Sequence, residues 1–356
     1  MTQSAMTEVM TMQRNSLFRP LLLVTALFSA GAFAEEAQTL TQPVSKGLYE
    51  LAYGQSSQQL YVASAGSRQE TGGAVYVLNP QSLKTEQVIK EPLKPFGVAI
   101  DNTQHILYTG NTRDGSITAI DLKTHKIIAQ QVVETRQRTE SFRPPQIREI
   151  TVDPTTHQVY ATGVGAESVV WVLDGKSLKV IKTITGVGKM ATGLAIDASQ
   201  HALYLSNADA EWIKIDTQNN SIVKRTKLDL PGDHMLLNVS LDTAGHRAFI
   251  ADFKQPQVVV IDTQTNKVLT SIKVPESLGV LFNAQRQELY VTHRKAGTVS
   301  IVDTKSYQVK RTVKTDGMPN SLALSDKGDV LYVTVKQPSS REKEATQPDT
   351  VLRITL

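Results

Sequence analysis

The sequence predicts an all-β fold, a seven-bladed β-propeller with four strands in each blade. An apolar residue followed by an aromatic one, at the start of a short strand, recurs seven times at intervals of 41 to 52 residues. Several short strands in a period of about forty residues are typical of a propeller. In five repeats a β-branched run ending in Asp follows, and turn-forming residues separate the strands. The recurring aromatic residues are Tyr61, Tyr108, Tyr160, Tyr204, Phe249, Tyr290 and Tyr332.

Each repeat is expected to supply strands a to d, counted from the ring axis outward. Strand a is a short apolar segment, expected at residues 51–53, 98–100, 149–152, 194–196, 239–241, 280–282 and 322–324. Strand b is the aromatic phrase, whose rings are expected to pack between neighbouring sheets because they recur at one position. Strand c is the β-branched run, expected at 117–121, 169–174, 213–216, 258–262 and 299–303. Strand d follows a turn such as residues 263–267.

The two ends of the chain predict how the ring closes. The last repeat stops after a strand c at residues 351–356, so it lacks its outer strand. Residues 38–43 precede the first full repeat and have no blade of their own. We expect this segment to add the missing strand to blade seven, which removes the edges that an open sheet would expose. A ring closed in this way is expected to be a monomer.

The first 34 residues read as a cleavable signal peptide. Arg14 and Arg19 precede an apolar stretch at residues 21–30, and small residues at 32–34 suit a cleavage site. An uncleaved anchor helix is the alternative. We therefore expect a periplasmic protein with one propeller domain at residues 35–356. The chain has no cysteine, which excludes disulfides, cysteine-bound metal, c-type haem attachment and thiol catalysis. Its net charge is +4, so the distribution of charge matters more than the total.

The histidines and aspartates give no sign of a catalytic or metal site. His105, His157, His201 and His246 each follow an Asp by four residues in an a–b turn, so they are spread around the ring with the blades. Four such ligands cannot share one zinc with bonds of about 2 Å. No nucleophile, nucleotide-binding or zinc-protease motif occurs. We expect no cofactor and no metal. A channel-mouth enzyme using inner-strand residues such as Arg148, Glu149 and Asn238 remains an alternative.

Cationic and aromatic residues collect in the b–c and d–a loops, which share one face of a propeller. The long d–a connection at residues 134–148 lengthens the second repeat and is rich in arginine. Lysine and arginine bind phosphates, and phenylalanine or an arginine plane stacks on bases, so this mixture suits single-stranded nucleic acid. A solvated rim balanced by nearby glutamates is the alternative. The candidate binding residues are Lys94, Phe96, Arg113, Arg136, Arg138, Phe142, Arg143, Arg148, Lys189, His234, His293 and Arg294.

The repeat at residues 289–309, with LYVT followed by GTVSIVDTKSYQV, resembles the YVTN-type β-propeller family. Irregular loops at 94–97, 138–140, 207–209, 275–278, 290–294 and 344–349 resemble periplasmic members of that family. The resemblance implies a seven-bladed periplasmic propeller with affinity for single-stranded DNA, iron-responsive expression and no established enzymatic activity. A periplasmic or envelope protein is the alternative partner. The long polar loop at 336–349 is expected either to cover the channel mouth or to be an ornament.

Overall fold

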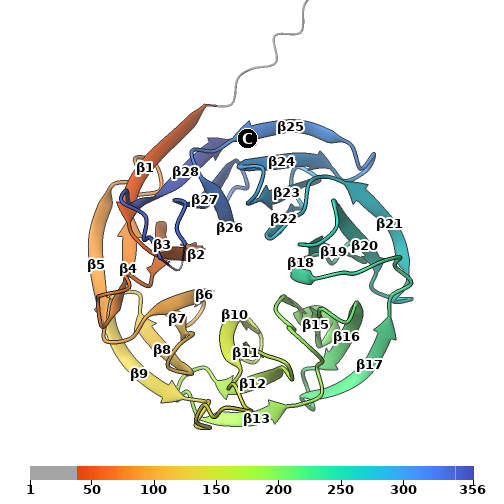
Figure 1. The fold of residues 1–356 in the computed structure, drawn as a ribbon, viewed down its shortest axis with the longest axis horizontal. Helices are drawn as coiled ribbons and strands as arrows, with labels where there is room; N and C mark the ends of the chain where they lie inside the picture. Colours follow the sequence, from red (N-terminus) through yellow and green to blue (C-terminus); the bar gives the residue numbers. More distant parts are fainter. Residues whose placement is uncertain (1–37, 341) are drawn as a thin grey trace, which may run out of the picture. The chain divides into compact units, whose positions relative to one another are not determined.

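In the computed structural model, which describes residues 38–340 and 342–356, seven four-stranded antiparallel sheets form a ring (Figure 1). The predicted seven-bladed propeller is confirmed. The expected signal peptide lies outside the described residues. The only helix among the described residues is a three-residue 3-10 turn, Ala198–Gln200, so none there is long and apolar enough to cross a membrane.

The blades follow one another along the chain, and the first strand of each lies nearest the axis (Figure 1). Blade 1 holds β2 (Leu48–Gly54), β3 (Gln59–Ser64), β4 (Gly73–Leu78) and β5 (Thr85–Glu91). Blade 2 holds β6 (Pro95–Asp101), β7 (Ile106–Asn111), β8 (Ser116–Asp121) and β9 (Lys126–Val132). Blade 3 holds β10 (Gln146–Val152), β11 (Gln158–Val164), β12 (Val169–Asp174) and β13 (Val180–Ile184).

The remaining blades repeat this pattern. Blade 4 holds β14 (Leu194–Asp197), β15 (Ala202–Ser206), β16 (Glu211–Asp216) and β17 (Ser221–Lys227). Blade 5 holds β18 (Leu236–Asp242), β19 (Arg247–Asp252), β20 (Gln257–Asp262) and β21 (Val268–Lys273). Blade 6 holds β22 (Val280–Asn283), β23 (Glu288–His293), β24 (Thr298–Asp303) and β25 (Val309–Lys314). Blade 7 holds β26 (Met318–Leu324), β27 (Val330–Lys336), β28 (Asp349–Thr355) and β1 (Thr39–Ser45).

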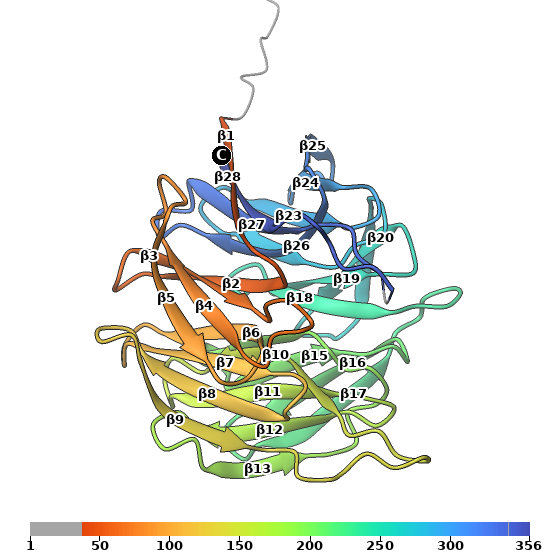
Figure 2. The same cartoon turned by 60° about the vertical axis from the view of Figure 1, so that its left-hand side comes forward.

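Blade 7 joins the two ends of the propeller chain. Strand β1 pairs antiparallel with β28, from Thr39 opposite Ile354 to Ser45 opposite Asp349, and the two strands lie side by side in both views (Figures 1 and 2). The predicted closure by the N-terminal segment is confirmed, although the strand runs two residues beyond the predicted end at Pro43. Pairing within one sheet holds the ring shut without a disulfide.

The recurring aromatic residues form the packing between blades, as predicted. All seven are buried, and none exposes more than 2% of its surface. Three phenol groups also donate hydrogen bonds to the next blade around the ring: Tyr108 to Gly175 O (2.9 Å), Tyr160 to Asn220 Oδ1 (2.9 Å) and Tyr332 to Pro80 O (3.0 Å). Fully burying a side chain of this size contributes roughly 1.5–3 kcal/mol. These contacts give the inner strands a fixed frame.

The inner strands are irregular at the level where they line the channel. Their pairing with strand b is interrupted by β-bulges, for example between Leu48 and Leu51 and between Ile147 and Ile150. A bulge bends the strand and redirects side chains. Threonine hydroxyls on strand b of one blade donate hydrogen bonds to backbone carbonyls at the inner strand of the next blade. Thr162 donates to Thr192 O (3.1 Å), Thr292 to Asn320 O (3.1 Å) and Thr334 to Tyr49 O (2.7 Å). The bulged residues therefore have defined directions toward the channel.

The a–b and c–d turns form what we call the turn face. The aspartates that end strand c are turn residues, as predicted: Asp121 Oδ1 accepts the N–H groups of Lys123 (3.0 Å) and Thr124 (2.6 Å), and Asp303 bonds its turn in the same way. His105, His157, His201 and His246 all have positive φ, between 47° and 59°, which fixes them as turn residues. No group of three or more His, Asp or Glu residues in 38–340 and 342–356 is arranged to hold a metal.

Candidate functional site

The b–c and d–a loops form the opposite surface, the loop face, and the predicted binding residues divide there into three sets. One set lines a groove beside blade 3. A second surrounds a pocket at the channel mouth. The third consists of side chains that are buried or lie apart from both.

The arginine groove is a depression of about 830 Å³ between the long d–a connection and blade 3. Five predicted residues line it together: Arg136, Arg138, Phe142, Arg143 and Arg148. Four lie in the connection between β9 and β10, while Arg148 lies on β10 itself. The sequence places these residues together because they are close along the chain. The volume of the groove is large enough for a nucleotide and parts of its neighbours, whereas a single small ion would fill only a small part of it.

Within the arginine groove, the side chain of Arg136 has a structural role. Its guanidinium pairs with Glu134 at 2.6 Å and lies 4.9 Å from the ring of Phe142. Burial acts to raise the pKa of Glu134, but the hydrogen bonds from Arg136 outweigh it, and the pKa is lowered overall. Arg138 and Arg143 are exposed, and neither forms an ion pair with any residue in 38–340 or 342–356. The groove therefore offers two exposed cations beside a positioned aromatic ring, with Glu140 and Glu167 also in its lining.

The mouth pocket is a smaller cavity of about 110 Å³ formed by blades 1, 2 and 7. Its polar lining includes Tyr49 from β2, Lys94 and Arg113 from loops of blade 2, and Lys336 and Asp349 from blade 7. Arg294, from the b–c loop of blade 6, interacts electrostatically with Tyr49, Lys336 and Asp349. Lys94, Arg113 and Arg294 were predicted from the sequence, whereas Tyr49, Lys336 and Asp349 were not.

The cations of the mouth pocket are partly withdrawn from water. Lys94 and Lys336 are buried, with their ammonium groups bonded to Ser67 O (2.5 Å) and Leu48 O (2.5 Å). Burial, followed by the charge of Arg113, lowers the pKa of Lys94. Burial lowers the pKa of Lys336 against the opposing effect of Asp349, and burial likewise lowers the pKa of Arg294. Desolvation without full compensation is costly for a positive charge.

Phe96 is a wall of the mouth pocket and leaves little of its ring exposed. The residue is 8% exposed on β6, its ring centre lies 4.0 Å from that of Tyr49, and the Arg148 guanidinium lies 5.8 Å away. The Lys336 ammonium also lies 4.0 Å from the centre of the Tyr49 ring. Tyr49 therefore contacts both an aromatic ring and a cation. In this arrangement Phe96 supports Tyr49, while the predicted stacking of Phe96 on a base lacks an open ring face.

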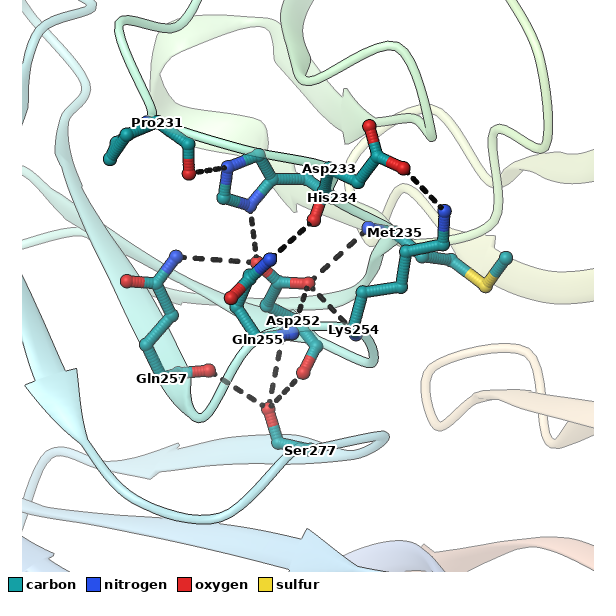
Figure 3. Close-up of polar contacts among 9 residues, drawn as sticks. All are labelled: Pro231, Asp233, His234, Met235, Asp252, Lys254, Gln255, Gln257 and Ser277. Atoms are coloured by element: carbon teal, nitrogen blue, oxygen red, sulfur yellow. Dashed lines mark hydrogen bonds and ion pairs between the residues drawn. The ribbon is translucent and has the colours of Figure 1, made fainter.

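His234 lies in the d–a loop between β17 and β18, and its side chain is buried. Figure 3 shows its ring between Pro231 and Asp252. Its Nδ1 lies 2.6 Å from Asp252 Oδ2, and its Nε2 lies 3.1 Å from Pro231 O. Asp252 Oδ1 also accepts three backbone N–H groups, from Met235, Lys254 and Gln255. This network fixes the loop, and both ring nitrogens are occupied within it.

His293 and Lys189 complete the predicted set. His293 is fully buried at the end of β23, with Nε2 2.9 Å from Ser300 Oγ and Nδ1 3.3 Å from Glu276 O, and burial lowers its pKa. Lys189 is exposed in the loop before β14, next to Met190, which lines the arginine groove. Of these two, only Lys189 presents its side chain to solvent.

The channel below the mouth contains the carboxyl groups of Glu50 and Glu149. The sequence analysis named Glu149 but not Glu50. Glu149 Oε2 accepts a hydrogen bond from Asn238 Nδ2 (3.0 Å), two blades away, and Glu50 Oε2 accepts one from Val98 N (2.9 Å). Burial raises the pKa of Glu149 to about 8, and burial with repulsion from Glu149 raises that of Glu50 well above its usual value. Burial thus favours the protonated form of both carboxyl groups, and the charge of Arg148 opposes this effect at Glu50.

Glycines allow the backbones of neighbouring inner strands to approach closely beside these carboxyl groups. A Cβ on Gly97 would lie 2.3 Å from Arg148 O, and one on Gly193 would lie 2.1 Å from Leu237 O. Around the ring, Gly97 lies between the inner strands that carry Glu50 and Glu149. Gly193 lies between those that carry Glu149 and Asn238. The alternation of glycine with a long polar residue on successive inner strands is the sequence signal that could have revealed Glu50.

Part of the long loop of blade 7 lines the mouth pocket, while its predicted role as a cover of the channel mouth stays a prediction. Gln337, Ser339, Glu344 and Ala345 line the mouth pocket. Glu344 Oε1 accepts the backbone N–H of Arg68 in blade 1 (2.9 Å). The loop therefore contacts the first blade across the junction between the two ends of the ring.

Comparison with known proteins identifies full-length relatives. The chain is 49% identical over 345 residues to a Salmonella typhimurium protein described as uncharacterized protein YncE, covering 96% of this chain and 97% of the relative. The YncE protein of Escherichia coli K12 shows the same identity and coverage. Antigen Lp49 of Leptospira interrogans is 22% identical over 250 residues, which cover 67% of this chain and 52% of the antigen. No protein-family model matches the chain.

Proposed function

The chain belongs to the YncE family of seven-bladed β-propellers, and from this premise we propose that it is a binding scaffold whose loop face holds single-stranded DNA without reading the sequence. The arginine groove is the observation that carries the proposal. Arg138 and Arg143 supply cations for backbone phosphates, and Phe142, held by Arg136, supplies a stacking surface. Charge that follows the backbone combined with an aromatic platform is how sequence-tolerant single-strand binders work.

The test is the binding of a fluorescent oligothymidine, followed by anisotropy over a series of salt concentrations. Each phosphate neutralised contributes about −0.7 to the slope of log K against log salt. The double variant Arg138→Ala/Arg143→Ala is expected to bind about tenfold more weakly at 50 mM salt and to lower the slope by about 1.4, two phosphates' worth. Phe142→Ala is expected to lose about 1–3 kcal/mol of stacking with the slope unchanged.

The matched control is Lys176→Ala/Lys305→Ala, which removes two exposed cations from the turn face and leaves the net charge equal to that of the double variant. It should bind as the wild type does. If both double variants weaken binding equally, only net charge matters and the groove is not the site. Displacement of the oligonucleotide by a saturable periplasmic protein, at a salt concentration where DNA no longer binds, would instead favour a protein partner.

We further propose that the protein acts in the periplasm as a monomer. The basic and apolar pattern of residues 14–34 supports export, and the pairing of β1 with β28 supports a self-contained ring. Recovery in the osmotic-shock fraction, with a mass near that of one chain by light scattering, is the expected result. Retention in the cytoplasmic fraction would contradict the first part, and a dimer mass the second.

A further inference from the structure

The mouth pocket gathers more positive than negative side chains, since five cations meet there beside the carboxylates of Asp349 and Glu344. Lys94, Arg113, Arg148, Arg294 and Lys336 all contact it or interact with its central residue, Tyr49. Of the five, only Lys336 forms an ion pair with a carboxylate in residues 38–340 and 342–356, with Asp349 at 3.2 Å. The other four cations come from blades 2, 3 and 6.

The carboxylates near the pocket offset part of this charge, and Glu344, Glu70 and Asp114 all act on Lys94. Asp349 accepts hydrogen bonds from Gln337 N (2.6 Å) and Leu48 N (2.9 Å) besides its pairing with Lys336. Glu344 accepts the N–H of Arg68 at 2.9 Å. Burial raises the pKa of Glu50 and of Glu149, deeper in the channel. An anion from outside the chain would be attracted to the remaining excess of positive charge.

The size and donors of the pocket define the anion. A volume of about 110 Å³ is large enough for a phosphate group. The hydroxyl of Tyr49 makes no hydrogen bond with any described residue, so it remains available as a donor. Guanidinium groups from separate blades match the several oxygens of a phosphate.

We propose that the mouth pocket binds a phosphate monoester dianion, held by Lys94, Arg113 and Arg294 with the Tyr49 hydroxyl as a further donor. Arg148 borders both sites, but Lys94, Arg113 and Arg294 do not line the arginine groove, so the proposal stands whether or not the groove binds DNA. The phosphate can belong to a small phosphorylated molecule or to the 5′ end of a DNA strand, and the experiment distinguishes these sources.

The first experiment measures inorganic phosphate binding to the purified protein by calorimetry at pH 7.5, with chloride at equal ionic strength as the reference. The wild type is expected to bind one phosphate per chain. Arg294→Gln and Arg113→Gln should each weaken phosphate binding at least tenfold, while Arg143→Gln in the arginine groove should leave it unchanged. Absence of phosphate binding, or equal binding by all four proteins, overturns the proposal. Circular dichroism confirms that each variant is folded.

The second experiment compares oligothymidines that differ only in a 5′-phosphate or a 5′-hydroxyl. If the strand end is the natural occupant, the phosphorylated oligonucleotide binds at least fivefold more tightly, and Arg294→Gln removes that preference. Equal affinity together with phosphate binding assigns the pocket to a small phosphorylated molecule. Arg143→Gln should weaken both oligonucleotides alike, so failure of the arginine groove and failure of the mouth pocket give different results.

Discussion

The two faces of the ring have similar kinds of charged residue but use them differently. On the turn face, charged side chains hold the turns: Asp101 accepts two turn N–H groups and the His157 ring (2.6 Å), and Arg247 pairs with Asp242 (2.7 Å). The loop face also contains ion pairs, such as that of Arg136 with Glu134, but Arg113, Arg138, Arg143 and Arg294 have no ion-pair partner among the residues in 38–340 and 342–356.

This difference separates stability from binding within one repeated fold. The same four-stranded unit presents short, self-satisfied turns on one side and longer, varied loops on the other. Loops on a rigid scaffold are where binding residues usually lie. Substitutions on the turn face should therefore change the free energy of unfolding, and those on the loop face should change affinity. The predictions below test this division, from the largest expected effect to the smallest.

The largest effect is expected from removing β1, on which both faces depend. A chain that starts at residue 46 leaves the edge of β28 unpaired and opens the ring. We expect a loss of more than 10 °C in Tm, or aggregation through the exposed edge. A chain that starts at residue 38 keeps β1 and should melt like the mature protein. Equal melting temperatures for the two chains would show that closure by β1 contributes little.

On the turn face, Arg247→Ala should destabilise the protein by about 3 kcal/mol, because it breaks a partly buried charge pair. The Arg247 side chain also donates to Thr304 O (2.6 Å) and the Tyr307 hydroxyl (3.1 Å), so it links blade 5 to blade 6. The measurement is urea unfolding, with the exposed Lys305→Ala of the same face as control. Oligonucleotide affinity should stay unchanged, and a parallel loss of affinity would contradict the division between faces.

The channel carboxyl groups give stability a pH dependence. The folded-state pKa of Glu149 is raised to about 8, so the folded protein binds its proton more tightly than the unfolded chain does. Stability is therefore favoured at low pH and is lost as pH rises from about 5 through about 8. Glu149→Gln keeps an acceptor for Asn238 and should flatten this decline, becoming more stable than the wild type at pH 8.5. The exposed Glu140→Gln should follow the wild-type curve at every pH.

The fold and the arginine groove could be predicted because their signals are local or periodic. The repeated aromatic residues mark every blade, and Arg136 to Arg148 lie within one connection, so proximity along the chain gives proximity in space. The mouth pocket was predicted only in part. Tyr49 and Lys336 lie within strands, and their directions depend on the strand a bulges and on the register between blades.

His234 and His293 show what could not be predicted from the sequence, namely the burial of their side chains. Their positions at the loop face are as the sequence indicates, but the loops fold over both rings, and acceptors such as Asp252 lie in a neighbouring strand. A single sequence assigns a residue to a face more readily than it assigns burial there. The same reasoning applies to Phe96, which is covered by Tyr49 from the adjacent blade.

The smallest effect on stability is expected on the loop face. Arg138→Ala/Arg143→Ala should change the free energy of unfolding by no more than about 0.5 kcal/mol, because both side chains are exposed and unpaired among the described residues. Removing two like charges from a cationic surface could even stabilise it slightly at low salt, and 0.5 M salt should cancel that gain. Urea unfolding at both salt concentrations provides the measurement. A loss above 1 kcal/mol would mean that these arginines help to hold the connection between β9 and β10 in place, and the contrast between the two faces would then be one of degree.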